Sequence, residues 1–152
     1  KYGFINKTGE LIIPLKYDAA TYYCERLAGV KMNEKYGFID KSRNQIISFK
    51  YDDVFPFFEG RAEVILNNKF GFIDKSGREI VSVKYDYLTD IYEGCIRAKI
   101  NSLYFGYVDK NGKEIIPFKY EDAREFNKGI AAVKYNGRWG YIDKKGTEFW
   151  EE

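Results

Sequence analysis

Residues 61–85 read RAEVILNNKFGFIDKSGREIVSVKY, and this stretch decides the fold. Its first two runs are rich in β-branched and aromatic residues, and they flank Asn67-Asn68, a pair that tolerates the positive φ angles of a two-residue hairpin turn. Residues 74–77 (DKSG) then place an aspartate that can bind its own backbone before a glycine suited to a left-handed position, which is typical of a second turn. A third β-rich run ends at Tyr85. The stretch therefore predicts three antiparallel strands joined by two tight turns.

The same unit recurs along the whole chain. A central aromatic-glycine block returns with its glycines 34 or 35 residues apart, at Gly3, Gly37, Gly71, Gly106 and Gly140. A Lys-Tyr-acid block keeps the same step at residues 16–18, 50–52, 84–86 and 119–121. We interpret residues 1–152 as a single array of about four and a half repeats, with motif starts near residues 1, 35, 69, 104 and 138, and as a piece of a longer protein.

Because no segment shows a helical period, the sequence predicts an all-β protein. Each repeat of about 34 residues is expected to contribute three antiparallel strands to an open, solenoid-like β-meander array. A closed ring resembling a β-propeller is the alternative.

Two copies depart from the residue pattern expected for these turns. Arg43 replaces the turn glycine, so we expect Asn44 to take the positive φ or the turn to lengthen, and residues 101–103 contain one extra hairpin residue.

Composition excludes several classes of protein. The chain has no histidine, so it offers neither a Ser-His-Asp triad nor a His-ligated metal, and two cysteines 71 residues apart do not make a zinc site. We therefore expect no metal and no cofactor. No stretch approaches the roughly 20 apolar residues of a membrane span, so no membrane insertion is expected. With 25 basic and 23 acidic residues, nucleic acid is an unfavoured partner. No signal peptide is recognised, and the compartment stays open, with secretion or the cell envelope slightly favoured.

Several blocks together resemble the WG repeat family of mainly bacterial proteins. They are Trp139-Gly140 and its aromatic-glycine counterparts, followed by Ile-Asp-Lys-x-Gly, Ile-Ile-Pro-x-Lys-Tyr-Asp and Phe-x-x-Gly. The resemblance covers essentially the whole chain, although only one copy has the tryptophan and the other four have tyrosine or phenylalanine. It implies a non-enzymatic repeat module, and by analogy it suggests aromatic-rich repeats that bind cell walls.

Pairing the hairpin strands sorts their side chains by face. On one face Val64 lies opposite Gly71 and Ala62 opposite Ile73, so this small aliphatic face is expected to be core. The other face places lysines opposite aromatic rings, and the candidate ligand-binding pairs are Lys31 with Tyr36, Lys99 with Phe105, and Lys134 with Trp139. These rows could hold a polymer such as a glycan through cation–π pairs. Alternatively, the rings form a second buried layer, which is the more usual role of a recurring aromatic residue.

The recurring charged residues are interpreted mainly as structural. Aspartates at every repeat (Asp40, Asp74, Asp109 and Asp143) indicate turn formation, since a catalytic pair would occur only once, and no catalytic residue is predicted. The lysines that follow them could track a polyanion, but solvated lysines that block sheet aggregation are the favoured interpretation. The functional hypothesis is a non-catalytic module that binds a protein or a cell-envelope polysaccharide. The alternative is a spacer with no ligand of its own.

Overall fold

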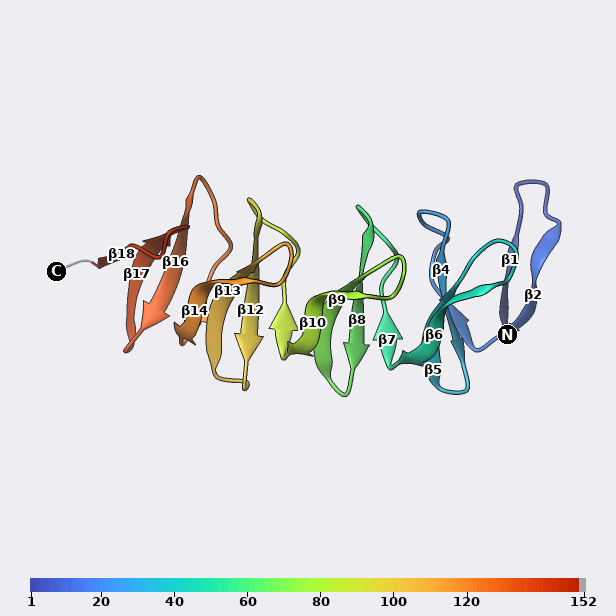
Figure 1. The fold of residues 1–152 in the computed structure, drawn as a ribbon, viewed down its shortest axis with the longest axis horizontal. Helices are drawn as coiled ribbons and strands as arrows, with labels where there is room; N and C mark the ends of the chain where they lie inside the picture. The colour runs from blue at the N-terminus through green and yellow to red at the C-terminus, as the bar shows by residue number, and fades with distance from the viewer. Residues whose placement is uncertain (151–152) are drawn as a thin grey trace. The chain divides into compact units, whose positions relative to one another are not determined.

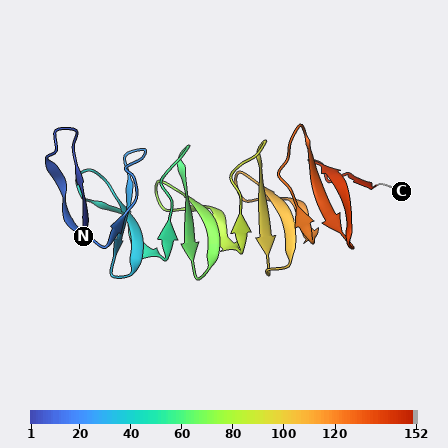
Figure 2. The same ribbon diagram turned by 180° about the vertical axis from the view of Figure 1, so that it is seen from behind.

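The computed structural model describes residues 1–150. All helices and strands assigned in that range are β-strands, so these residues contain no helix. The chain divides into two compact units, Lys1–Val83 and Lys84–Glu152. Within them the strands gather into small antiparallel sheets, seen from the two sides in Figure 1 and Figure 2. Each sheet keeps its strands in chain order, so each is a meander with two open edges and none closes into a barrel. The predicted all-β class of tandem antiparallel repeats is confirmed.

The first sheet has two strands and the other four sheets have four each. The first sheet pairs β1 (Tyr2–Ile5) with β2 (Leu11–Tyr17). The second contains β3 (Ala19–Ala20), β4 (Ala28–Met32), β5 (Lys35–Ile39) and β6 (Gln45–Tyr51). The third contains β7 (Asp53–Val54), β8 (Arg61–Leu66), β9 (Lys69–Asp74) and β10 (Glu79–Tyr85). The fourth contains β11 (Tyr87–Leu88), β12 (Cys95–Ile100), β13 (Tyr104–Asp109) and β14 (Glu114–Tyr120). The fifth contains β15 (Asp122–Ala123), β16 (Ile130–Tyr135), β17 (Arg138–Asp143) and β18 (Glu148–Trp150).

The three strands that the sequence predicts for each repeat are present, and a fourth, two-residue strand is added to each complete sheet. This extra strand (β3, β7, β11 or β15) directly continues the long strand of the repeat before it. In residues 45–54, for example, Tyr51 pairs with Tyr36 in the second sheet, whereas Asp53 pairs with Ile65 in the third. Two residues are too few to show an alternating pattern, so this strand could not be predicted from local sequence.

The bend between the long and the short strand is fixed by the Lys-Tyr-acid block. Tyr51 is 1% exposed, and the next residue, Asp52, accepts the backbone N–H of Asn67 in the following hairpin turn at 2.6 Å. Asp52 also forms an ion pair with Lys35. The Lys35 ammonium and the Asn67 N–H together lower the pKa of Asp52. In the other unit Glu121 accepts the N–H of Gly137 at 3.1 Å, so the same hydrogen bond between the acid and the following hairpin turn recurs there.

The glycine of the aromatic-glycine block lies beneath a bulge in the long strand. The register of β5 and β6 shifts between Tyr36 and Phe38, where several residues of β6 lie opposite Gly37. A Cβ atom on Gly37 would lie 2.6 Å from the carbonyl oxygen of Ile47, which is too close for any side chain. The expectation that this glycine allows a close backbone approach is therefore confirmed.

Within each unit the core lies between consecutive sheets. One cluster joins Phe38 of β5 to Val64 and Ile73 of the next hairpin, and all three are at most 1% exposed. The rings of Phe38 and Phe57 meet edge to face with centroids 4.9 Å apart, so the aromatic-x-x-Gly loop closes this core. In the other unit the equivalent rings of Tyr107 and Phe126 make a tilted contact, with centroids 4.8 Å apart. The aliphatic hairpin face is thus core, as predicted.

The turns follow the predicted chemistry, with one correction. Asp74 accepts the backbone N–H groups of Ser76 at 2.9 Å and of Arg78 at 3.1 Å, which confirms its turn-forming role. The expectation for residue 43 is wrong, because Arg43 itself takes the left-handed conformation with φ of 71°. Asp40 still accepts the N–H of Asn44 at 2.8 Å, so the turn keeps its length and Arg43 must adopt the conformation that glycine has elsewhere.

A second set of contacts joins the turns of neighbouring sheets. In unit Lys1–Val83 the carboxylate of Glu25 accepts the N–H of Gly60 at 3.1 Å and pairs with Lys75 at 2.8 Å. In unit Lys84–Glu152 the carboxylate of Glu93 accepts the N–H of Gly129 at 3.0 Å and pairs with Lys144 at 2.9 Å. Two lysines that the sequence suggested were simply solvated therefore form ion pairs between repeats.

We predict that Val133→Asp destabilises unit Lys84–Glu152 strongly. Val133 is 0% exposed in the core between the fourth and fifth sheets, so the substitution buries a carboxylate without a partner, at a cost of about 3 kcal/mol or more. Urea denaturation followed by circular dichroism measures the loss. The control Lys110→Ala changes an exposed turn residue and is expected to alter the free energy of unfolding by less than about 0.5 kcal/mol. Equal curves for parent and Val133→Asp would show that the assigned core is wrong.

We also predict that Asp52 stabilises the fold only while it is ionised. Its folded-state pKa is lowered, so its contribution is present above the unfolded value of about 3.9 and is lost as the pH falls through the lower, folded value. Asp52→Asn should therefore be less stable than the parent at pH 7, and the two proteins should converge towards pH 3. Urea midpoints between pH 3 and pH 7 test this. Asp53→Asn is the control, because the carboxylate of Asp53 accepts the N–H of the adjoining Val54 and not that of the following hairpin turn. Its urea midpoint at pH 7 should differ less from that of the parent.

Candidate functional site

The structure reproduces the predicted register of all three candidate pairs. Lys31 lies opposite Tyr36, Lys99 opposite Phe105 and Lys134 opposite Trp139. The Nζ atoms of Lys31 and Lys99 lie over their rings, 5.6 Å and 4.9 Å from the centroids. In the last pair the arrangement differs, because the cation over the Trp139 ring is the guanidinium of Arg124, at 5.4 Å. Cation–aromatic pairing is thus a recurring feature of this face, with a different cation in the last copy.

The aromatic residues on this face have two different environments. The ring after the motif glycine is buried in Phe38, Phe72 and Tyr107, at 4% exposure or less. The ring before the glycine is only partly buried in Tyr36, Phe70 and Phe105, and Trp139 in the last copy is 43% exposed. In the last copy, however, the ring after the glycine, Tyr141, is 50% exposed. The ring after the glycine therefore belongs to a second core in the three middle copies, and the ring before it is partly accessible in each of them.

In unit Lys84–Glu152 this face contains a groove of about 420 Å³ between the fourth and fifth sheets. Two of the predicted site residues, Lys99 and Phe105, line it. Tyr87 of β11, Arg97 of β12 and Arg124 beyond β15 also line it, and sequence reasoning did not single out any of these three. Asp86 and Asp122 line it as well, so the groove has both acidic and basic side chains. Hereafter "the groove" means this cavity. Lys31, Tyr36, Lys134 and Trp139 do not line it.

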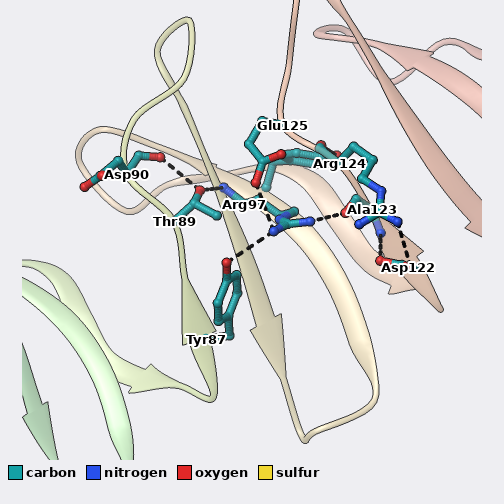
Figure 3. A network of polar contacts seen from close by, with 9 residues as sticks. Tyr87, Thr89, Asp90, Arg97, Asp122, Ala123, Arg124 and Glu125 are labelled. Atoms are coloured by element: carbon teal, nitrogen blue, oxygen red, sulfur yellow. Dashed lines mark hydrogen bonds and ion pairs between the residues drawn. The ribbon is translucent and has the colours of Figure 1, made fainter.

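Arg97 is the centre of the groove's polar network (Figure 3). Its guanidinium donates to the carbonyl oxygen of Ala123, donates to the hydroxyl of Tyr87 at 3.2 Å and pairs with Glu125 at 2.9 Å. Its backbone N–H donates to the hydroxyl of Thr89 at 3.1 Å. These bonds tie β12 to the short strand β11 on one side and to the loop after β15 on the other, so Arg97 connects two sheets of the unit.

The same guanidinium lies against two rings. Its Cζ atom is 5.3 Å from the centroid of Tyr87 and 5.5 Å from that of Phe105. The side chain is only 10% exposed, and its Nε atom is buried without a hydrogen-bond partner among residues 1–150. An unpaired buried donor is costly, so the surrounding contacts must offset that cost. The result is a charged group held in one position rather than a flexible surface arginine.

The sequence did contain a signal for Arg97. The positions equivalent to it in the other hairpins are Gly29, Glu63 and Ala132, so a buried cation occurs in one copy only. The one extra hairpin residue, at residues 101–103, belongs to the same copy, and Ser102 within it lines the groove. A comparison of each repeat with the others, rather than a search for what they share, identifies these positions.

The acidic residues of the repeats serve as hydrogen-bond acceptors. Bonds to the Asn44 side chain lower the pKa of Asp40, and the Ser76 hydroxyl does the same for Asp74. The backbone N–H of Thr147 likewise lowers the pKa of Asp143. These carboxyl groups are therefore ionised at neutral pH and engaged in turns. Residues 1–150 contain no group of three or more acidic or cysteine side chains placed to hold a metal ion.

The chain belongs to the WG containing repeat family, which matches it in four successive copies at residues 2–36, 36–70, 70–104 and 105–139. The resemblance inferred from the repeated blocks is thereby confirmed. Among solved structures the chain is similar to the crystal structure of the computationally designed Ika8 protein, with 11% sequence identity and a TM-score of 0.44. That alignment covers 88% of this chain and 48% of the designed protein. No curated protein sequence matches the chain significantly.

Residues 1–150 contain no helix with the length and apolar character that a bilayer crossing requires.

We predict that Arg97→Met destabilises unit Lys84–Glu152 by about 2 kcal/mol, because Ala123 and Glu125 lose a buried donor. Arg97→Lys should restore little of this loss, since one ammonium group cannot reproduce the planar fork that reaches three acceptors. Urea denaturation measures both variants. Lys113→Met, at an exposed position, is the control and should differ from the parent by less than about 0.5 kcal/mol. Full rescue by Arg97→Lys would mean that charge alone matters at this position.

Proposed function

We propose that this protein is a non-catalytic interaction module that holds an extended partner, a protein or a cell-envelope polysaccharide, against the cation–aromatic face of its hairpins. The observation that carries the proposal is the recurrence of a cation held over a partly exposed ring, at Lys31, Lys99 and Arg124. A recurring arrangement suits a partner that is itself extended or repetitive, because several weak contacts are then made together.

The geometry of each pair supports binding in physical terms. A cation over an aromatic ring gains about 0.5–1 kcal/mol at an exposed site. The contact also limits the rotamers of a long side chain, so less conformational entropy remains to be lost when a partner binds. Lysine and arginine head groups restrained in this way are better prepared for a ligand than those on a featureless surface.

The use of the carboxylates supports a non-catalytic role. The aspartates that recur in every repeat accept hydrogen bonds within turns, and Asp52 and Glu121 accept them at the bends between sheets. A general acid would need a raised pKa, whereas the pKa values of Asp40, Asp52 and Asp74 are lowered.

A structural spacer is the second candidate function. It is favoured by the contacts that join neighbouring sheets, in particular Glu25 with Gly60 and Lys75, because these stiffen an array without involving any ligand. A spacer requires no accessible cation–aromatic pairs, and the two candidates therefore differ in whether the face binds anything.

Arrays of peptides and envelope polysaccharides first identify a polymer that binds the parent protein. We predict that the triple variant Lys31→Ser, Lys99→Ser and Lys134→Ser binds this polymer at least tenfold more weakly. The control combines Lys110→Ser, Lys113→Ser and Lys145→Ser, which removes the same charge from exposed positions on the β13–β14 and β17–β18 turns. Affinity is measured by biolayer interferometry, and unchanged thermal melting confirms the fold. A parent protein that binds nothing on either array would support the spacer instead.

A further inference from the structure

In two of the sheets, the tight turn that leads into the hairpin binds a carboxylate. In the fifth sheet this turn is Lys128-Gly129, and its two backbone N–H groups donate to the carboxylate of Glu93 at 2.6 Å and 3.0 Å. The ammonium of Lys144, from the same sheet, pairs with that carboxylate at 2.9 Å. Two N–H groups and one lysine therefore hold a glutamate side chain that comes from the sheet before.

The third sheet repeats this arrangement. Gly60, in the turn before β8, donates its N–H to the carboxylate of Glu25 at 3.1 Å, and Lys75 pairs with the same carboxylate at 2.8 Å. Lys75 and the N–H groups of Gly60 and Glu59 hold the pKa of Glu25 below its usual value. Successive N–H groups in a turn form a concave site for an anion, and the charge of the carboxylate strengthens each bond.

The second sheet has the same turn, but no carboxylate is bound to it. The turn before β4 is Glu25-Arg26, with φ angles of 48° and 74°, close to the 48° and 78° of the equivalent turn in the third sheet. Within residues 1–150 the backbone N–H groups of Glu25 and Arg26 have no hydrogen-bond acceptor. The carboxylate of Glu25 itself is bound at the next turn, so it does not fill this one.

The lysine of this sheet is also without an acid. Lys41 occupies the position that Lys75 and Lys144 have in their repeats, and its ammonium forms no ion pair within residues 1–150. It lies 5.4 Å from the centroid of the Tyr23 ring, which restrains it. We propose that the Glu25-Arg26 turn and Lys41 form a binding site for a glutamate side chain of a partner polypeptide. This site lies in the loops and is separate from the lysine–aromatic pairs of the proposed function.

The charges around the site suit a carboxylate. A cavity of about 510 Å³ adjoins Lys41, and Lys7 also lines it, whereas none of its lining residues is acidic. Glu10 lies near its rim, and its carboxylate accepts the side-chain amide of Asn6 at 2.6 Å. Asp40 precedes Lys41 in the chain, but an aspartate also precedes the lysine in both occupied sites. An acid at that position therefore does not prevent a carboxylate from binding.

The apolar part of the cavity favours a polypeptide as the ligand. In the occupied site of the third sheet, Glu25 is followed two positions later by Leu27, which is only 6% exposed. Ile5 and Ile12 line the cavity beside Lys41 and are 65% and 37% exposed. A peptide with the same spacing of glutamate and leucine has an aliphatic side chain to cover them, and burial of apolar surface adds to affinity. An acidic polysaccharide supplies the carboxylate alone.

The test uses an acetylated, fluorescently labelled peptide with the sequence of residues 25–30 (ERLAGV), and fluorescence anisotropy measures its Kd for the whole chain. Lys41→Met is expected to raise Kd at least tenfold, and Lys113→Met, at an exposed position elsewhere, less than twofold. The same peptide with glutamine in place of glutamate should bind the parent at least tenfold more weakly. Arg26→Gly should leave Kd within threefold, because the site uses the backbone N–H and glycine readily adopts the left-handed φ. Thermal melting confirms that each variant is folded.

An NMR titration of the parent protein locates the bound carboxylate. The peptide is expected to move the amide proton resonances of Glu25 and Arg26 downfield, because a carboxylate accepts both N–H groups. Unchanged resonances at a saturating peptide concentration would overturn the proposal, as would equal losses of affinity in Lys41→Met and Lys113→Met. Tighter binding of oligogalacturonate than of the peptide at these amides would exclude a polypeptide ligand. The proposed function is tested at Lys31, Lys99 and Lys134 instead, so the two failures are distinguishable.

Discussion

The structure depends on one bend, at the acid that follows the buried tyrosine of each Lys-Tyr-acid block. Before the bend the strand completes one sheet, and after it the strand starts the next, as residues 45–54 show on either side of Asp52. The buried ring of Tyr51 anchors the first sheet, and the carboxylate of Asp52 binds the hairpin turn of the second. Neither sheet can form fully without the other at this point, so stability must be shared between neighbours, as in other repeat proteins.

The packing follows from this bend together with one glycine. The long strand bulges over Gly37, which brings its carbonyl groups too close for a side chain at that position. The bulge and the bend direct the strand towards the next sheet, and the core then fills with aliphatic residues from one hairpin and the ring of Phe38 from the previous one. Phe57 covers this ring from the following loop. A short block of sequence thus determines both where a sheet ends and what packs against it.

Much of this could be predicted from the sequence because it is local and repeated. The hairpin at Asn67-Asn68, the turn at Asp74 and the aliphatic face of Val64 all follow from residue type and alternation over a few positions, and the structure confirms each of them. The two-residue strands could not be predicted, because they are defined by pairing with a hairpin that comes later in the chain. The groove was also missed. Arg97 acquires its surroundings from Ala123 and Glu125 in the next repeat, and no local pattern connects them.

The repeated residues therefore build the fold, and the residues that differ between repeats are the ones to examine for function. Amide hydrogen exchange of the whole chain with Asp52→Asn tests this account most directly. Faster exchange in both β6 and β8, the strands on either side of the bend, is the predicted result. Faster exchange in only one of these strands would contradict it, because the two sheets would then form independently.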